Sequence, residues 1–181
     1  MRCRAVTILP TVAIAAAACA AVSANAASPP ASWTISPSGI GPIKIGMSVA
    51  QAQRASGIRL GPLQKIDPSS SCAYVVPRNR KLHFSLILTN GRVGRVDTGS
   101  RDVPTDAGAR VGDTERQVRA RYPRGVVSRP HTYVKGGHEL VVSPAGPSGR
   151  SHHVIFETDG HRVTYIRAGR DPEVEYVEGC A

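Results

Sequence analysis

Two stretches of the chain alternate apolar and polar residues, a period of two that predicts half-buried β-strands. Every second residue from Leu82 to Leu88 is apolar, and Asn90-Gly91 then supplies the dipeptide of a tight hairpin turn. The return strand is therefore predicted over 92–99. The same arrangement recurs at 153–158 and 162–169, with an Asp-Gly turn between them.

Each predicted hairpin follows a short helix whose start is marked by a capping box. Ser48 and Thr114 are each followed three positions later by Gln. In a capping box the hydroxyl accepts from the third helical N–H, and the Gln side chain reaches back to the cap. Helices are therefore predicted over 49–56 and 115–122, with a Gly after the first and a Pro after the second.

The segments 43–99 and 109–169 share this order of helix, strand and hairpin, which favours an internal duplication. The alternative is chance similarity between two amphipathic hairpins. We predict an α+β fold in which two tandem helix-plus-hairpin repeats form an antiparallel sheet, with the short helices packed on one side. The expected single domain covers 43–181, with a C-terminal strand within 170–181, and 27–42 forms an N-terminal extension. Further strands are expected at 72–76, 131–134, 139–143 and 174–177.

The first 26 residues have the pattern of an export signal. Arg2 and Arg4 precede an apolar run from Ala5 to Val22, and small residues before the cut mark a signal-peptidase site after Ala26. Cleavage there leaves a secreted domain of 155 residues. Two alternatives remain. One is a membrane-spanning helix, which the alanine-rich run disfavours; the other is a lipid anchor at Cys19, because the residues before it loosely resemble a lipobox.

Cysteine usage fits an exported protein. Cys3 and Cys19 lie within the expected signal, so Cys72 and Cys180 form the one intramolecular disulfide that an oxidising compartment would allow. In the chain-entropy model a closed loop on the order of 100 residues stabilises a fold by about 4 to 5 kcal/mol. Two free thiols or an intermolecular bridge are the alternatives.

The chain carries a net charge of +10, which favours attraction to an anionic partner: an envelope polymer, a membrane surface or nucleic acid. Most of its basic residues are Arg, however, and Arg- and Ala-rich usage is also typical of proteins from GC-rich bacterial genomes. Arginines on or beside the predicted return strands are candidates for binding an anion or a partner, the alternative being solubilising surface charge. These are Arg92, Arg95, Arg162, Arg167 and Arg170.

The sequence contains no motif that indicates catalysis or metal binding. The segment 41–48 has phosphate-loop spacing, but Met47 stands where that loop needs Lys. The histidines form no HxH or HExxH pattern, so no metal site is expected. Glu173 and Glu175 would share one face of a strand, as a general acid–base pair or, more simply, as part of a solvated acidic edge opposing the Arg-rich strands.

Gly46-Met47-Ser48 at the start of the first helix, Gly57 at its end and the counterpart at Gly112 resemble the helix-plus-hairpin unit of the β-lactamase-inhibitor-protein-like fold. Single copies of a similar unit occur in small outer-membrane assembly lipoproteins. The resemblance covers 43–99 and 109–169 and implies a protein that works by surface contact. The chain departs from those inhibitors, which present many exposed aromatic residues on a concave sheet. It has eight aromatic residues in all, most of them expected in the core.

These observations predict a secreted bacterial binding module without enzymatic activity, either an inhibitor or an envelope-associated interaction protein. Its expected partner is a protein or an anionic envelope ligand, with no specific nucleic acid, no membrane span, no cofactor and no metal. The alternative is a small extracellular hydrolase whose site is not visible from residue spacing.

Overall fold

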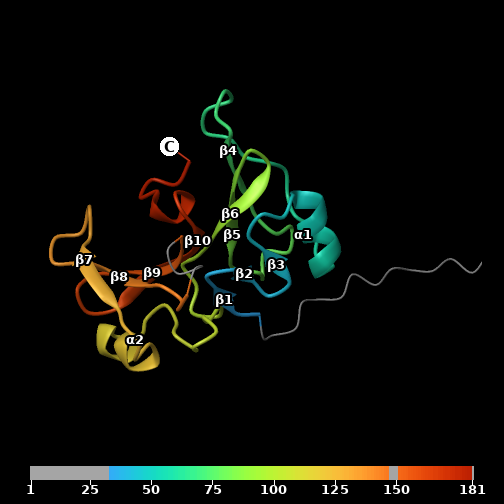
Figure 1. The fold of residues 1–181 in the computed structure, drawn as a ribbon. Helices are drawn as coiled ribbons and strands as arrows, with labels where there is room; N and C mark the ends of the chain where they lie inside the picture. Colours follow the sequence, from blue (N-terminus) through green and yellow to red (C-terminus); the bar gives the residue numbers. More distant parts are fainter. Residues whose placement is uncertain (1–32, 147–150, 181) are drawn as a thin grey trace, which may run out of the picture.

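Two antiparallel sheets and two short α-helices make up the part of the chain that the computed structural model describes, residues 33–146 and 151–180 (Figure 1). The fold class is therefore α+β, as predicted. The expected signal peptide, its cleavage after Ala26 and the alternative anchor at Cys19 lie outside the described residues. Within the described ranges, no helix is long and apolar enough to cross a membrane.

The larger sheet has seven strands, and both halves of the chain contribute to it. Its order is β4-β5-β6-β10-β9-β8-β7, so the hairpins β5–β6 and β9–β10 meet at the centre, where β6 pairs with β10. In that pairing Val96 lies opposite Ala168, and Asp97 opposite Arg167. The strands are β4 (Cys72–Val75), β5 (Ser85–Thr89), β6 (Arg92–Thr98), β7 (Val127–Pro130), β8 (His138–Val142), β9 (His152–Thr158) and β10 (Val163–Arg170).

Two strands of the smaller sheet come from the segment 27–42, which was expected to be an N-terminal extension. The sheet consists of β1 (Ile35–Ser36), β2 (Gly39–Ile40) and β3 (Ile43–Lys44). Ile35 and Ile40 are buried in the main core, and the N–H of Ile35 donates to the carbonyl of Pro104 at 2.8 Å. The folded domain therefore begins before residue 43.

Both helices begin at the predicted capping boxes. In α1 (Val49–Ser56) the Ser48 hydroxyl accepts from the Gln51 N–H, and the Gln51 side chain accepts from the Ser48 N–H at 2.8 Å. In α2 (Glu115–Arg121) Thr114 and Gln117 make the same two contacts.

Each capped start is also joined to the return strand of the hairpin that follows it. The N–H of Gly46 donates to the carbonyl of Val93 at 2.7 Å, and that of Gly112 donates to the carbonyl of Val163 at 2.8 Å. The position of each helix on the sheet is thus fixed by backbone hydrogen bonds next to its cap.

One face of the seven-stranded sheet is apolar and carries both helices. Ala52 of α1 and Val118 of α2 are fully buried in a core that also contains Leu86, Phe156 and Ile166 from the strands. Because successive residues of a strand point to opposite faces, the neighbours of these core residues project from the other side of the sheet.

Two expected strands are absent from the described structure. The segment 131–134 forms a turn, because the ring Nδ1 of His131 accepts from the N–H of Tyr133 at 3.0 Å, and the strand lies earlier, at β7. The expected strand at 174–177 is replaced by a 3₁₀ helix, η2 (Glu173–Glu175). Pro172 has no N–H to donate to a strand ladder, and the buried Glu173 side chain pairs instead with Arg170.

Candidate functional site

The face of the large sheet opposite the helices is lined by charged side chains, and we call it the polar face. Arg95 and Asp97 of β6, Arg167 of β10, Glu157 of β9 and Glu139 of β8 project from it, and most of them are buried. Such burial is tolerated only when the charges are paired.

The charges of the polar face are joined in ion pairs, most of them through Arg167 and Arg129. Arg167 is fully buried and contacts both Glu139 and Glu157. The Nε of Arg129 lies 2.6 Å from Glu139, and that of Arg95 lies 2.6 Å from Asp97. These arginines are therefore occupied by internal carboxylates.

The carboxylates respond differently to this environment. Burial raises the pKa of Glu139, but Arg167 and Arg129 act more strongly together and hold that pKa below its usual value. Burial also raises the pKa of Asp97, and there the opposing effects of Arg95 and Arg167 do not suffice, so the pKa stays above its usual value.

The C-terminal segment, residues 171–180, lies across the polar face. Its 3₁₀ helix η2 packs on β6, β9 and β10, and Arg95 donates to the carbonyl of Glu173 at 3.2 Å. The segment runs between the β7–β8 hairpin and β4 (Figure 1). Contacts of Glu175 with Arg129 and of Glu178 with Tyr133 hold it on the hairpin side.

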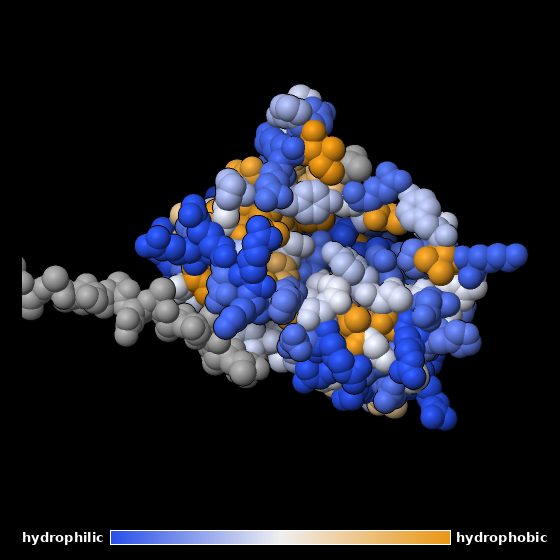
Figure 2. Space-filling model, turned by 180° about the vertical axis from the view of Figure 1, so that it is seen from behind, coloured by the Kyte–Doolittle hydropathy of each residue, from blue (hydrophilic) through white to orange (hydrophobic). Residues whose placement is uncertain are grey.

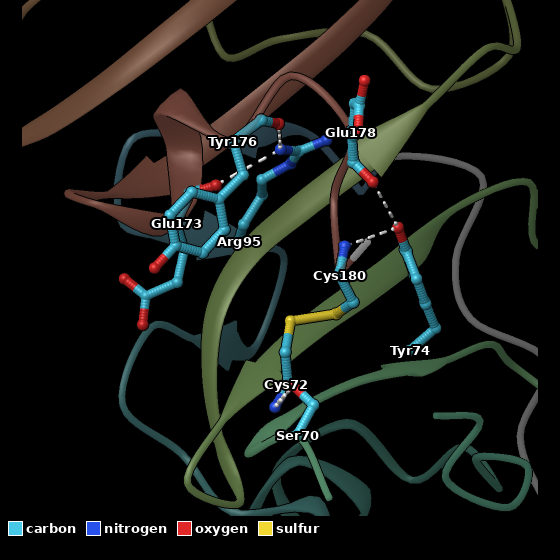
Figure 3. Close-up of a disulfide and its surroundings, with 8 residues drawn as sticks. All are labelled: Ser70, Cys72, Tyr74, Arg95, Glu173, Tyr176, Glu178 and Cys180. Carbon is cyan, nitrogen blue, oxygen red and sulfur yellow. Dashed lines mark hydrogen bonds between the residues drawn. A yellow bond between two sulfur atoms is a disulfide. The ribbon is translucent and has the colours of Figure 1, made fainter. Parts of the chain in front are cut away.

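A disulfide fastens the same segment on the other side. Cys180 is bonded to Cys72 of β4, as predicted, and the N–H of Cys180 donates to the Tyr74 hydroxyl at 2.9 Å (Figure 3). Ile87 and Tyr74 pack against the bridge. The segment is thus attached at both sides of the sheet.

At the junction of β9 and the C-terminal segment, His153 lies between a hydroxyl and two carboxylates. Its Nδ1 is 2.8 Å from Ser143 Oγ, and its Nε2 is 3.3 Å from Asp171 Oδ2. Glu175 is close enough that ligand atoms of His153, Asp171 and Glu175 all lie within 4.8 Å of one another. This arrangement has the residue types of a proton-transfer site or of a metal site.

A cleft of about 590 Å³ lies between the end of α2 and the ends of β8 and β9, and Ser143, the partner of His153, is among the residues that line it. We call it the α2 cleft. Its apolar lining includes Pro37, Tyr122, Pro123, Val142, Pro144 and Val154. Arg121 and Arg124 lie at its polar border with Asp106. The volume falls in the range of small-molecule sites.

Three groups in or beside the cleft are already engaged, and one of them is Arg121, whose Nε lies 3.6 Å from Asp113. The Asp106 carboxylate accepts from the N–H of Ala107 at 2.8 Å, and the Tyr122 hydroxyl donates to Thr105 at 2.8 Å. Burial raises the pKa of Tyr122 to about 12, so the phenol is neutral at physiological pH. Arg124 has no ion-pair partner among the described residues.

The five arginines selected from the sequence do not come together. Arg95, Arg167 and Arg170 lie on the polar face, and Arg170 pairs with Glu173 at 2.9 Å. Arg92 and Arg162 are exposed and lie at opposite ends of the antiparallel β6–β10 pair, each beside a helix cap.

The acidic residues and His153 acquire their positions from tertiary contacts that spacing does not reveal. The expected acidic edge does oppose Arg-rich strands, through Glu173 and Glu175, but Glu173 is buried rather than solvated. His153 and Asp171 are 18 residues apart, and only the β9–β10 register brings them together. The sequence offered one indication of this site: His153 lies in the hairpin that precedes the acid-rich segment 171–178.

No protein-family model matches the chain, and no curated protein matches it. Among solved structures, the chain is similar to an extracellular protein containing an SCP domain from Bacillus anthracis, with 10% identity and a TM-score of 0.48 over 70% of this chain. The chain spans 44% of that protein's length. It is also similar to the uncharacterized protein YfeY from Escherichia coli, with 15% identity and a TM-score of 0.48, covering 76% of this chain and 99% of that one.

Proposed function

We propose that the chain is an exported bacterial binding module without enzymatic activity, which holds an anionic ligand with an apolar portion in the α2 cleft. The observation that carries this proposal is the meeting of an apolar lining with Arg121 and Arg124 at one cleft of ligand size. Small-molecule sites typically combine apolar walls with a few placed polar groups that fix the ligand's orientation.

Charge complementarity favours an anion over a cation. Asp106 is the one carboxylate among the residues that line the cleft, against Arg124 and Arg121, although Arg121 also pairs with Asp113 at 3.6 Å. Arg119, in the last turn of α2 with Arg121, adds further positive charge at this end of the helix. Hydrophilic residues cover most of one side of the molecule, with hydrophobic residues exposed in small separate areas (Figure 2). The α2 cleft is therefore a better candidate for the binding site than a broad apolar docking surface.

Export and duplication are part of the same proposal. The Cys72–Cys180 disulfide supports an oxidising, extracytoplasmic location, reached through the signal at residues 1–26. The matching cap and backbone contacts of α1 and α2 support descent of 43–99 and 109–169 from one unit. Such a duplication agrees with the resemblance to the β-lactamase-inhibitor-protein-like fold and with a protein that works by binding.

The test is calorimetric titration of the oxidised domain with dodecyl phosphate and, separately, dodecyltrimethylammonium, both below their micelle concentrations. We expect the phosphate to bind and the ammonium not to. Arg124→Gln should weaken binding about tenfold or more, because a charge-assisted contact contributes about 1.5 to 3 kcal/mol. Ala145→Trp should block the cleft.

Arg116→Gln is the matched control, since Arg116 lies on α2 but does not line the cleft. Equal binding of the two amphiphiles would reject the proposal. So would equal weakening by Arg124→Gln and Arg116→Gln, because general surface charge would then explain the affinity.

A hydrolase is the second candidate, and the hydrogen-bonded series Ser143–His153–Asp171 is the observation that favours it. These are the residue types of a nucleophile, a base and an orienting acid. A fluorophosphonate probe should label Ser143 if it is an activated nucleophile, and Ser143→Ala should then abolish the label. The binding proposal expects no labelling of either protein.

A further inference from the structure

The group of His153, Asp171 and Glu175 has the spacing of a metal site. The three residues come from β9, from the position after β10 and from η2, and none is fully exposed. Tetrahedral zinc holds its ligand atoms at about 2.0 Å, which places neighbouring donors about 3.3 Å apart. His153 Nε2 and Asp171 Oδ2 are separated by 3.3 Å.

The hydrogen bond between His153 and Ser143 prepares the ring for such a role. When Nδ1–H donates to Ser143 Oγ, the lone pair of Nε2 points toward the carboxylates. Metal-binding histidines nearly always donate their other N–H to an oxygen in this way. In this protonation state Ser143 accepts a hydrogen bond, so the ring does not act as its base.

Carboxylate oxygens without a hydrogen-bond partner also favour metal binding at this group. Asp171 Oδ1 is buried and has no hydrogen-bond partner among the described residues. Arg129 holds Glu175 through Oε2, so the other carboxylate oxygen remains for an ion. A buried acceptor without a partner is unfavourable, and an ion that Asp171 binds through both carboxylate oxygens would satisfy Oδ1 as well as Oδ2.

The excess negative charge around the site also favours binding of a divalent cation. The polar face carries four arginines, Arg95, Arg129, Arg167 and Arg170, and six carboxylates, of which five pair with an arginine and one with His153. The carboxylates are Asp97, Glu139, Glu157, Asp171, Glu173 and Glu175. The network therefore has two more negative than positive charges when its histidines are neutral.

From these observations we propose that His153, Asp171 and Glu175 bind one divalent transition-metal ion, with zinc the best fit to one imidazole and two carboxylates. Ser143 is a positioning residue that fixes the ring. The ion fastens the C-terminal segment to β9, in addition to the disulfide at the other side of the sheet. Three protein ligands leave one coordination position for water. The proposal does not require a ligand in the α2 cleft, although Ser143 also lines that cleft.

The test is calorimetric titration of the chelator-treated, disulfide-bonded domain with zinc chloride, together with visible absorption of the cobalt-loaded protein. We expect one ion per chain and a tetrahedral cobalt spectrum. His153→Ala should weaken zinc binding at least about 100-fold. Ser143→Ala should weaken it about 10-fold, the range found when an outer hydrogen-bond partner of a metal ligand is removed.

His152→Ala is the matched control, because His152 neighbours His153 on β9 and its side chain projects to the opposite face. It should bind zinc like the unaltered protein. Asp171→Asn and Glu175→Gln each remove one charged ligand and keep the side-chain size. Circular dichroism can verify that each variant is folded, so a change in zinc binding reports on the ligand set. No stoichiometric uptake by the unaltered protein would overturn the proposal, as would equal losses in His152→Ala and His153→Ala.

Discussion

Replacing Arg167 by Met would test whether the polar face depends on its buried charge network. Arg167 is fully buried and is the partner of both Glu139 and Glu157. Methionine keeps much of the side-chain length but leaves two carboxylates without that cation. Removing one partner of a buried ion pair costs about 3 to 5 kcal/mol. Because domains of this size unfold with about 5 to 15 kcal/mol, the variant should lose a large part of its stability.

The loss of stability in Arg167→Met should be smaller at low pH than at neutral pH. In the unaltered protein the pKa of Glu139 is lowered, so its contribution is present at neutral pH and is lost as pH falls through the folded-state pKa. Without Arg167, Arg129 alone opposes the effect of burial, so the pKa of Glu139 moves upward. Protonation at lower pH then relieves the variant, and the stability difference between the two proteins shrinks.

Urea unfolding of both oxidised proteins at pH 7 and at pH 4.5 measures this difference. Arg162→Met is the control, because Arg162 is exposed and should change the free energy of unfolding by about 1 kcal/mol or less. A cost below about 1 kcal/mol for Arg167→Met, or a cost that does not shrink at pH 4.5, would refute the reasoning.

Three further perturbations test other parts of the fold. Reducing the Cys72–Cys180 bridge should lower the free energy of unfolding by about 2 to 5 kcal/mol in a urea titration, and an unchanged value would show that the bridge does not restrain the unfolded chain. Gly94→Ala should speed hydrogen exchange in η2, because the new Cβ would lie 2.7 Å from the Glu173 side chain; Gly99→Ala, which meets only ordinary contacts, should not. Ser48→Ala should cost about 1 kcal/mol in thermal unfolding through loss of the α1 cap, and a neutral result would contradict the capping-box assignment.

Local features of the fold could be predicted from the sequence, since they depend on residues close together in the chain. The capping boxes at Ser48 and Thr114 fixed the starts of both helices, and alternation with an Asn-Gly turn located β5 and β6. The disulfide joins residues 108 apart, yet it was predictable because Cys72 and Cys180 were the one pair left after the signal.

The charge network and the His153 group could not be predicted in the same way. Arg129 and Glu175 are 46 residues apart, and Arg167 and Glu139 are 28 apart. Their meeting depends on strand order and on the path of the C-terminal segment. The alternation of β10 places Arg167 on one face, but only the positions of β8 and β9 show that this face is covered and buried.

The central pairing of β6 with β10 has a consequence for how the sheet resists strand-by-strand association with other chains. Each strand would be the bare edge of a half-sheet if the other half were missing, and its unpaired N–H and C=O groups would form a template for another chain. The two halves therefore protect each other from strand-by-strand association. Cutting the chain between Thr98 and Ala109 gives two fragments, and their separation would expose the edges of β6 and β10. The fragments should therefore recombine with each other or self-associate rather than remain folded alone.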